Sequence, residues 1–222
     1  MSLPVNCSNI LLNQPFTTAN DFTVSFTYTM NTSGTDTTTN YGFSVFFIDG
    51  GINSLTGGGT GPGLGVVSST GNAVNGVFAT IGFDITGLFS KILSIPPFTT
   101  GNTNQVTNSI GLRVSPNFTF AGSYYIFPIN PYLYGPLGPE PTAEAYQTVR
   151  VSVRKNFTEI DVYSLANETY VKLATFNLNL SALPSTAKMG IGYSGDTFFE
   201  VQNITVNYTW VLTGLDTKSF IL

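Results

Sequence analysis

Glu159 and Asp161 are closely spaced acids with which the chain could carry out chemistry, in the segment Glu159-Ile-Asp-Val-Tyr-Ser164. Retaining glycoside hydrolysis requires two carboxyl groups that flank the scissile bond, one as nucleophile and one as acid and base. The segment ends in Ser164, and a serine hydroxyl cannot protonate the leaving oxygen. A hairpin turn is expected just before it, so both acids are predicted to lie on the solvent-exposed face of a strand. We therefore predict no catalytic site and no enzymatic activity.

The chain contains no histidine and a single cysteine, Cys7. Histidine is the usual general base near neutral pH and a common ligand of transition metals, so both kinds of site lack their usual residue. Cys7 has no second cysteine for an intramolecular disulfide and no histidine to activate its thiol. We expect no cofactor and interpret Cys7 as a structural residue.

Charged residues make up only 9% of the 222 residues, hydrophobic residues make up 42%, and the net charge is −4. This balance is typical of a folded chain. Eight Lys and Arg residues cannot neutralise a run of phosphates, which argues against nucleic acid and anionic membrane surfaces as partners. We also predict no transmembrane segment and no signal peptide, since no long apolar run and no basic leader is present.

Apolar and polar residues alternate with a period of two over much of the chain, as in strands with one buried face. Further segments are rich in β-branched and aromatic residues and are bounded by Gly, Pro, Asn and Ser. No segment shows a sustained helical period. The expected strands cover residues 22–30, 41–48, 77–85, 109–114, 149–153, 158–165, 171–180, 188–193 and 203–210, and the fold class is all-β.

Two long connections separate these strands. Residues 49–76 are rich in glycine, and residues 115–147 carry many aromatic residues among six prolines. Long connections without regular structure are usually functional or ordered by a partner. The aromatic stretch 118–134 either packs over the edge of a sheet or forms an apolar patch that a neighbouring subunit covers.

Segments between residues 20 and 211 resemble, in order, those of the L-type (legume-type) lectins. Tyr41-Gly-Phe-Ser-Val-Phe-Phe-Ile resembles their Asp-Gly-x-Ala-Phe-Phe strand, and Val77-Phe-Ala-Thr-Ile-Gly-Phe-Asp-Ile resembles Val-Ala-Val-Glu-Phe-Asp-Thr. Met189-Gly-Ile-Gly-Tyr-Ser-Gly is similar to Val-Gly-Phe-Ser-Ala. The resemblance implies a concanavalin A-like jelly-roll β-sandwich of two antiparallel sheets, formed by one domain over residues 1–222 with its core at 20–211.

The resemblance also implies a sugar site in the loops above the concave sheet. Sugar recognition combines polar groups that bond to hydroxyls with an aromatic face that packs against the sugar C–H groups. The matching positions of this chain carry suitable residue types, although such residues are also common in turns. The candidate carbohydrate-binding residues are Asn40, Tyr41, Gly59, Gly63, Ser194, Gly195 and Asp196.

In the family a Glu, two Asp and an Asn hold a transition metal and calcium. The Glu position is Gly82 in this chain, and Asp84 is retained without the oxygen ligands expected just after it. Asp84 and Asp49 remain the calcium candidates, with Asp196 as a further loop carboxylate. We expect no metal and interpret Asp84 as a carboxylate that accepts hydrogen bonds from loop amides.

Three functional classes remain open. The first is a viral structural protein, such as a capsid decoration, head-fibre or tail component, which would lie at the virion surface or be extracellular. Its partners would be copies of itself or other virion proteins, with host glycans bound through the loops near residues 40–63 and 194–196. The low charge, the Thr/Asn/Gly-rich composition and the lack of a signal peptide favour this class.

The second class is a free-standing soluble lectin. The third is a glycoside hydrolase, since one glycosidase family shares the sandwich and carries Glu-x-Asp-x-x-Glu on a strand. The third acid of that motif is replaced by Ser164 in this chain.

Overall fold

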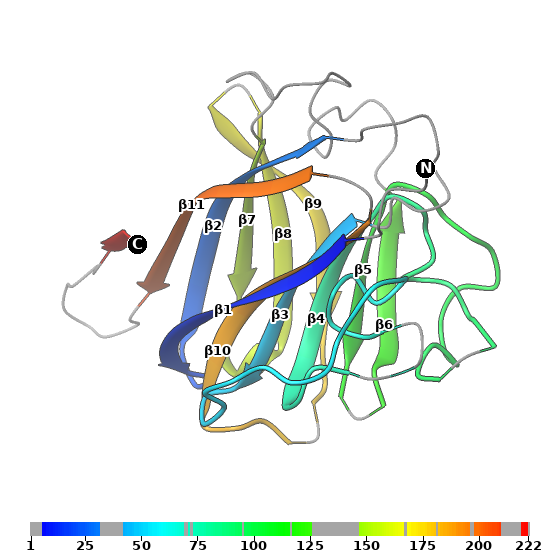
Figure 1. Cartoon of the computed structure of the whole chain (residues 1–222). Coiled ribbons are helices and arrows are strands. Elements are labelled where there is room, and N and C mark those ends of the chain that lie inside the picture. Colours follow the sequence, from blue (N-terminus) through cyan, green and yellow to red (C-terminus); the bar gives the residue numbers. More distant parts are fainter. Residues whose placement is uncertain are drawn as a thin grey trace. The chain divides into compact units, whose positions relative to one another are not determined.

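The computed structural model describes residues 6–31, 42–68, 71, 73–94, 96–115, 117–125, 147–166, 168–180, 182–195, 198–209 and 219–221. In this part of the chain every regular element is a strand, apart from a 3-10 turn at Lys155–Phe157 (Figure 1). The all-β prediction is therefore confirmed. No helix among the described residues has the length and hydropathy needed to cross a membrane.

The strands form two antiparallel six-stranded sheets, which fall into two compact units. The first unit comprises Met1–Phe16, Gly34–Pro128 and Pro184–Thr197, and the second comprises Thr17–Ser33, Ile129–Leu183 and Phe198–Leu222. We call the sheet of the first unit sheet A and that of the second sheet B. One domain over residues 1–222 stays a prediction.

Sheet A has the strand order β1-β10-β3-β4-β5-β6. Its strands are β1 (Asn6–Thr17), β10 (Thr186–Gly195), β3 (Gly42–Asp49), β4 (Val77–Asp84), β5 (Ser109–Val114) and β6 (Thr119–Tyr125). Sheet B has the order β12-β11-β2-β7-β8-β9. Its strands are β12 (Ser219–Ile221), β11 (Phe198–Thr209), β2 (Asp21–Asn31), β7 (Gln147–Val153), β8 (Glu159–Ala166) and β9 (Thr169–Asn177).

Strand β3 is buried on both faces, which explains its almost unbroken apolar sequence. On one face, Phe43 stacks on Phe83 of β4 with 4.4 Å between ring centroids. On the other face, Phe46 and Ile48 join a cluster of buried side chains that long connections contribute. Both faces of sheet A therefore take part in the packing of the first unit.

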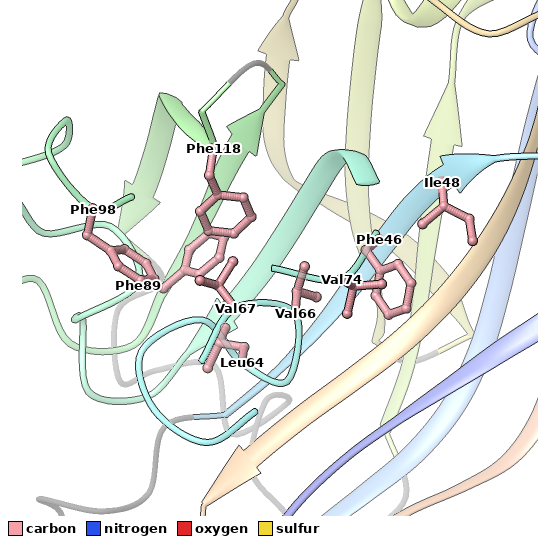
Figure 2. Close-up of a cluster of buried hydrophobic side chains, with 9 residues drawn as sticks. All are labelled: Phe46, Ile48, Leu64, Val66, Val67, Val74, Phe89, Phe98 and Phe118. Carbon is pink, nitrogen blue, oxygen red and sulfur yellow. The ribbon is translucent and has the colours of Figure 1, made fainter. Parts of the chain in front are cut away.

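The second face of sheet A is covered by its own connections (Figure 2). The glycine-rich connection supplies four side chains and later segments supply three phenylalanines. Phe118 belongs to this core, so the start of the aromatic stretch packs on the sheet, and residues 126–134 lie outside the described residues. The cluster consists of Phe46, Ile48, Leu64, Val66, Val67, Val74, Phe89, Phe98 and Phe118.

Sheet B shows the alternation that its sequence predicts. In β2, Phe22, Val24, Phe26 and Tyr28 are buried, while Thr23, Ser25 and Thr27 between them are partly exposed. These polar residues form cross-strand hydrogen bonds, for example Thr27 to Thr148 of β7 at 3.0 Å between hydroxyl oxygens.

Three strands lie outside the expected set: β1, β6 and β12. The expectation that residues 115–147 lack regular structure is wrong for Thr119–Tyr125, which form β6. The sequence of β6, Thr-Phe-Ala-Gly-Ser-Tyr-Tyr, has no alternation of apolar and polar residues from which a strand could be predicted. It lies at the edge of its sheet and pairs with β5. Asp49 ends β3, and the described residues of the remaining glycine-rich connection, 50–76, form isolated bridges but no strand, as expected.

Candidate functional site

One end of sheet A brings together strand residues that adjoin several of the predicted loop positions in the chain. In the ladder of four strands, Ser194 of β10 pairs with Gly42 of β3, Gly42 pairs with Asp84 of β4, and Asp84 pairs with Ser109 of β5. The candidates Asn40 and Tyr41 precede Gly42 directly in the chain, and Asp196 follows Gly195. These three lie outside the described residues.

The glycine-rich connection is hydrogen-bonded to the same end of the sheet. The Gly61 amide donates to Ser194 Oγ at 2.8 Å, and Ser44 Oγ donates to the Leu64 carbonyl oxygen at 2.9 Å. Asn9 of β1 donates its side-chain amide to the Gly65 carbonyl oxygen. Residues 61–65 are therefore held over β10 and β3.

These bonds assign different roles to the described candidates. Ser194 is fully buried and its hydroxyl accepts from Gly61, so it positions the connection. Gly63 is buried and forms a bridge with Val67. Gly59 is partly exposed, with a φ of 153° that favours glycine. Gly195 ends β10 directly after Ser194.

Asp84 holds the turn that follows β4. Its side chain is buried, Oδ1 accepts from the Gly87 amide at 2.8 Å and from Thr86 Oγ1 at 3.1 Å, and Oδ2 accepts from the Phe89 amide at 2.7 Å. Burial raises the pKa of Asp84 to about 7, although these hydrogen bonds act in the opposite direction. The prediction that Asp84 satisfies loop amides is confirmed.

Arg113 of β5 is a buried cation beside this turn. Its guanidinium donates to three carbonyl oxygens, through Nε to Phe89 at 2.7 Å, through one terminal nitrogen to Phe118 at 3.1 Å and through the other to Lys91 at 3.2 Å. Four phenylalanine rings lie 4.8–5.6 Å from its central carbon. Burial lowers the pKa of Arg113 to about 10, and the charge of Asp84 counteracts this effect.

Sequence reasoning placed Arg113 in a strand but assigned it no role. The available signal was a charged residue inside Ser-Ile-Gly-Leu-Arg-Val, a strand whose other side chains are small or apolar. A charge in such a strand must be paired or surrounded by hydrogen-bond acceptors when it is buried.

The residues present do not fit the metal pair of the L-type lectins. Asp49 and Asp84 lie at opposite ends of the β3–β4 ladder, roughly 20 Å apart at about 3.3 Å per residue, so they cannot hold one ion. Asp49 is exposed and accepts from the Gly51 amide at 2.8 Å. Within the described ranges, no three His, Cys, Asp or Glu side chains gather in a group that could bind a metal.

Asp161 and Glu159, the acids of the hydrolase-like segment, form hydrogen bonds and ion pairs with residues of sheet B and its turns. Contrary to expectation, Asp161 is buried, at 1% exposure, because β9 side chains cover it. Its carboxylate accepts from Thr175 at 2.6 Å and Tyr163 at 3.1 Å and pairs with Lys172 at 2.9 Å. Glu159 pairs with Arg154 at 3.5 Å.

Solved structures of lectins resemble the chain over most of its length. The peanut lectin, with a nine-residue peptide, matches with a TM-score of 0.60 and 16% identity, over 94% of this chain and 83% of that one. The Bauhinia forficata lectin in complex with GalNAc matches with a TM-score of 0.61 and 14% identity, over 93% of this chain and 81% of that one. The VIP36 exoplasmic/lumenal domain, in its Ca²⁺- and Man-bound form, gives 0.60 and 10%, over 98% and 81%.

The chain has the L-type lectin fold. This fold is the concanavalin A-like sandwich of two antiparallel sheets that the sequence resemblance implied. The sequence matches no protein-family model and no curated protein. At 10–16% identity, the likeness to these lectins concerns the fold.

Proposed function

We propose that the chain is a non-enzymatic carbohydrate-binding lectin. Its glycan site would be formed by the loops at the end of sheet A where Ser194, Gly42 and Asp84 lie in one row. The observation that supports the proposal is that, in a chain with the L-type lectin fold, Ser194 and Gly42, which adjoin the segments that the sequence resemblance assigned to sugar binding, are paired in one row with Asp84.

The candidate residues would have distinct roles. Asn40 and Asp196 supply an amide and a carboxylate for sugar hydroxyls, and the ring of Tyr41 supplies an aromatic face. Gly59 and Gly195 offer backbone groups that a sugar can approach closely. Ser194 and Gly63 act indirectly, because they fix the glycine-rich connection.

The ligand class we propose is a neutral hexose or N-acetylhexosamine. Lectins of similar structure have been solved in complex with galactose, GalNAc and mannose. A chain with only eight basic residues also suits a neutral ligand better than a polyanion.

The lectin neighbours support this function in preference to the viral structural role that the sequence favoured first. The hydrolase alternative also loses support, because Asp161 is buried and committed to three partners. The proposal includes self-association as a way of presenting several sites at once.

The test is a glycan array followed by calorimetric titration of the strongest neutral sugar. Asn40→Ala, Tyr41→Ala and Asp196→Ala should each weaken binding by about tenfold or more, since about 1.4 kcal/mol corresponds to tenfold. Val171→Ala, at an exposed position of β9, is the matched control and should leave the affinity unchanged. A wild-type chain that binds no glycan, or three variants that bind normally, would refute the proposal.

A further inference from the structure

A row of small residues crosses five strands of sheet A on the face that the connections cover. Gly192 of β10, Ser44 of β3, Gly82 of β4, Gly111 of β5 and Ser123 of β6 are successive partners in the ladder. Small side chains leave room for other groups to lie directly against the strands. The connections of the first unit use this room.

The ring of Phe89 fills the space in front of Gly82. A Cβ atom built at Gly82 would lie 2.6 Å from this ring, and one at Gly111 would lie 3.0 Å from it. Gly82 is the position at which the family carries its metal-binding Glu. The structure therefore has an aromatic ring where the resemblance implies a carboxylate ligand and its ion.

Asp84 offers no free carboxylate oxygen to an ion. Each oxygen already accepts at least one hydrogen bond from the turn that follows, from Gly87 and Thr86 on Oδ1 and from Phe89 on Oδ2. A bound cation would have to compete with these donors in a buried site.

Arg113 supplies the positive charge of this region. Backbone carbonyl oxygens of Phe89, Lys91 and Phe118 converge on its guanidinium, much as oxygen ligands converge on a hard cation. Phe89 connects the two charged groups, since its amide donates to Asp84 and its carbonyl accepts from Arg113. The turn at residues 85–91 is thus held by two side chains of the chain itself.

We propose that Asp84, Phe89 and Arg113 replace the divalent metal ions of the L-type lectins, so that the loops of the candidate glycan site are organised without metal. The functional part of this inference rests on the proposed glycan site. Its structural part does not, and the two can be tested separately.

The first test measures the unfolding temperature and metal content of the full chain. After dialysis against EDTA, the midpoint should agree within about 1 °C in EDTA, millimolar Ca²⁺ and millimolar Mn²⁺, because an ion bound only to the folded state would raise it. Metal analysis should find far less than one ion per chain. A rise of several degrees with either ion, or one retained ion per chain, would overturn the inference.

Asp84→Asn separates hydrogen bonding from ion binding. The variant should unfold at a lower temperature by the same amount in EDTA and in Ca²⁺, because it loses acceptors for its own loop. A lowering seen only with Ca²⁺ would contradict the inference. Asp49→Asn is the matched control, since Asp49 is exposed and the described hydrogen bond of its carboxylate is the one from the Gly51 amide.

Glycan affinity gives the functional readout. If the chain binds a glycan, its Kd should differ by less than about twofold between EDTA and Ca²⁺, as linkage predicts for an ion that is not bound. Binding abolished by EDTA would overturn the inference and leave the proposed function intact. A chain that binds no glycan would defeat the proposed function, while the unfolding data would still decide the metal question.

Discussion

Arg113 is enclosed by carbonyl oxygens and aromatic rings, and no carboxylate among the described residues forms an ion pair with it. Three hydrogen bonds and four phenylalanine contacts surround a side chain with 0% exposure. A buried charge is tolerated only when such partners compensate its lost hydration. Removing the guanidinium would deprive three carbonyl groups of this donor, two of them, those of Phe89 and Phe118, on buried residues.

Arg113→Leu should therefore lower the free energy of unfolding by about 3–5 kcal/mol, and Arg113→Lys should recover part of this loss. Urea denaturation provides the measurement. Arg154→Leu is the control, because Arg154 is 55% exposed and its ion pairs at 3.5–3.6 Å should contribute less than about 1 kcal/mol. Equal effects at the two arginines would contradict this account.

The pKa of Asp161 is lowered, whereas that of Asp84 is raised. Burial raises its pKa, but hydrogen bonds from Thr175, Lys172 and Tyr163 outweigh burial, and the pKa lies below its ordinary value of 3.8. A carboxyl whose pKa is lower in the folded state stabilises the fold above its unfolded pKa. That stability is lost as the pH falls through 3.8 toward the folded value.

Asp161→Asn should cost about 1–3 kcal/mol at pH 7, because Lys172 loses its anionic partner and an acceptor oxygen is removed. The difference from the wild type should shrink as the pH falls below 3.8. Unfolding free energies measured from pH 7 to pH 3 check this. A difference that is constant with pH would show that the charge of Asp161 has no role.

At the scale of the element, the small residues of sheet A determine how closely the connections can approach its strands. The Leu64 carbonyl oxygen would lie 2.6 Å from a Cβ at Gly192, and the Phe89 ring would lie equally close to one at Gly82. No positive φ is involved at either glycine, so the requirement is one of space.

Gly82→Ala should displace the Phe89 ring and lower stability by about 1–3 kcal/mol, the usual cost of overpacking. It should also weaken glycan binding, because the turn at 85–91 moves with the ring. Gly51→Ala is the control, since Gly51 is exposed and its added Cβ would lie 3.4 Å from the Asp49 carboxylate, an ordinary contact. Thermal unfolding of both variants decides whether space at Gly82 matters.

The strands that sequence reasoning found are those with a strong apolar period, such as 22–30 in β2. The missed strands β1, β6 and β12 all lie at the edges of their sheets. An edge strand is paired on one side, so it tolerates polar residues and the Pro15 of β1, and its pattern is weak. The predicted loop positions adjoin one end of sheet A, but the contacts among Asp84, Phe89 and Arg113 depend on register between distant strands.

At the scale of the whole molecule, the low charge determines how solution conditions act. With 9% charged residues and a net charge of −4, little of the surface can respond to added salt. Binding of a neutral sugar shares this property, because the ligand carries no charge that salt could screen.

Glycan affinity should therefore change by less than about twofold between low and high salt, since screening acts on charges and not on neutral hydrogen bonds. Titrations at about 0.05 M and 0.5 M NaCl measure this, because the Debye length falls severalfold over that range. A steep loss of affinity with salt would indicate an anionic ligand and contradict the neutral sugar that we propose.

The connections pack closely against the strand glycines, and this close packing would limit which substitutions can change the ligand preference of the proposed site during evolution. Residues at the loop tips can be exchanged one at a time, each with a local effect on ligand choice. A substitution at Gly192 or Gly82 would instead lift a whole connection, so a position remote from any ligand would alter many contacts at once. For the proposed glycan site, we therefore expect substitutions to be better tolerated at the loop tips than at these glycines of the strands beneath them.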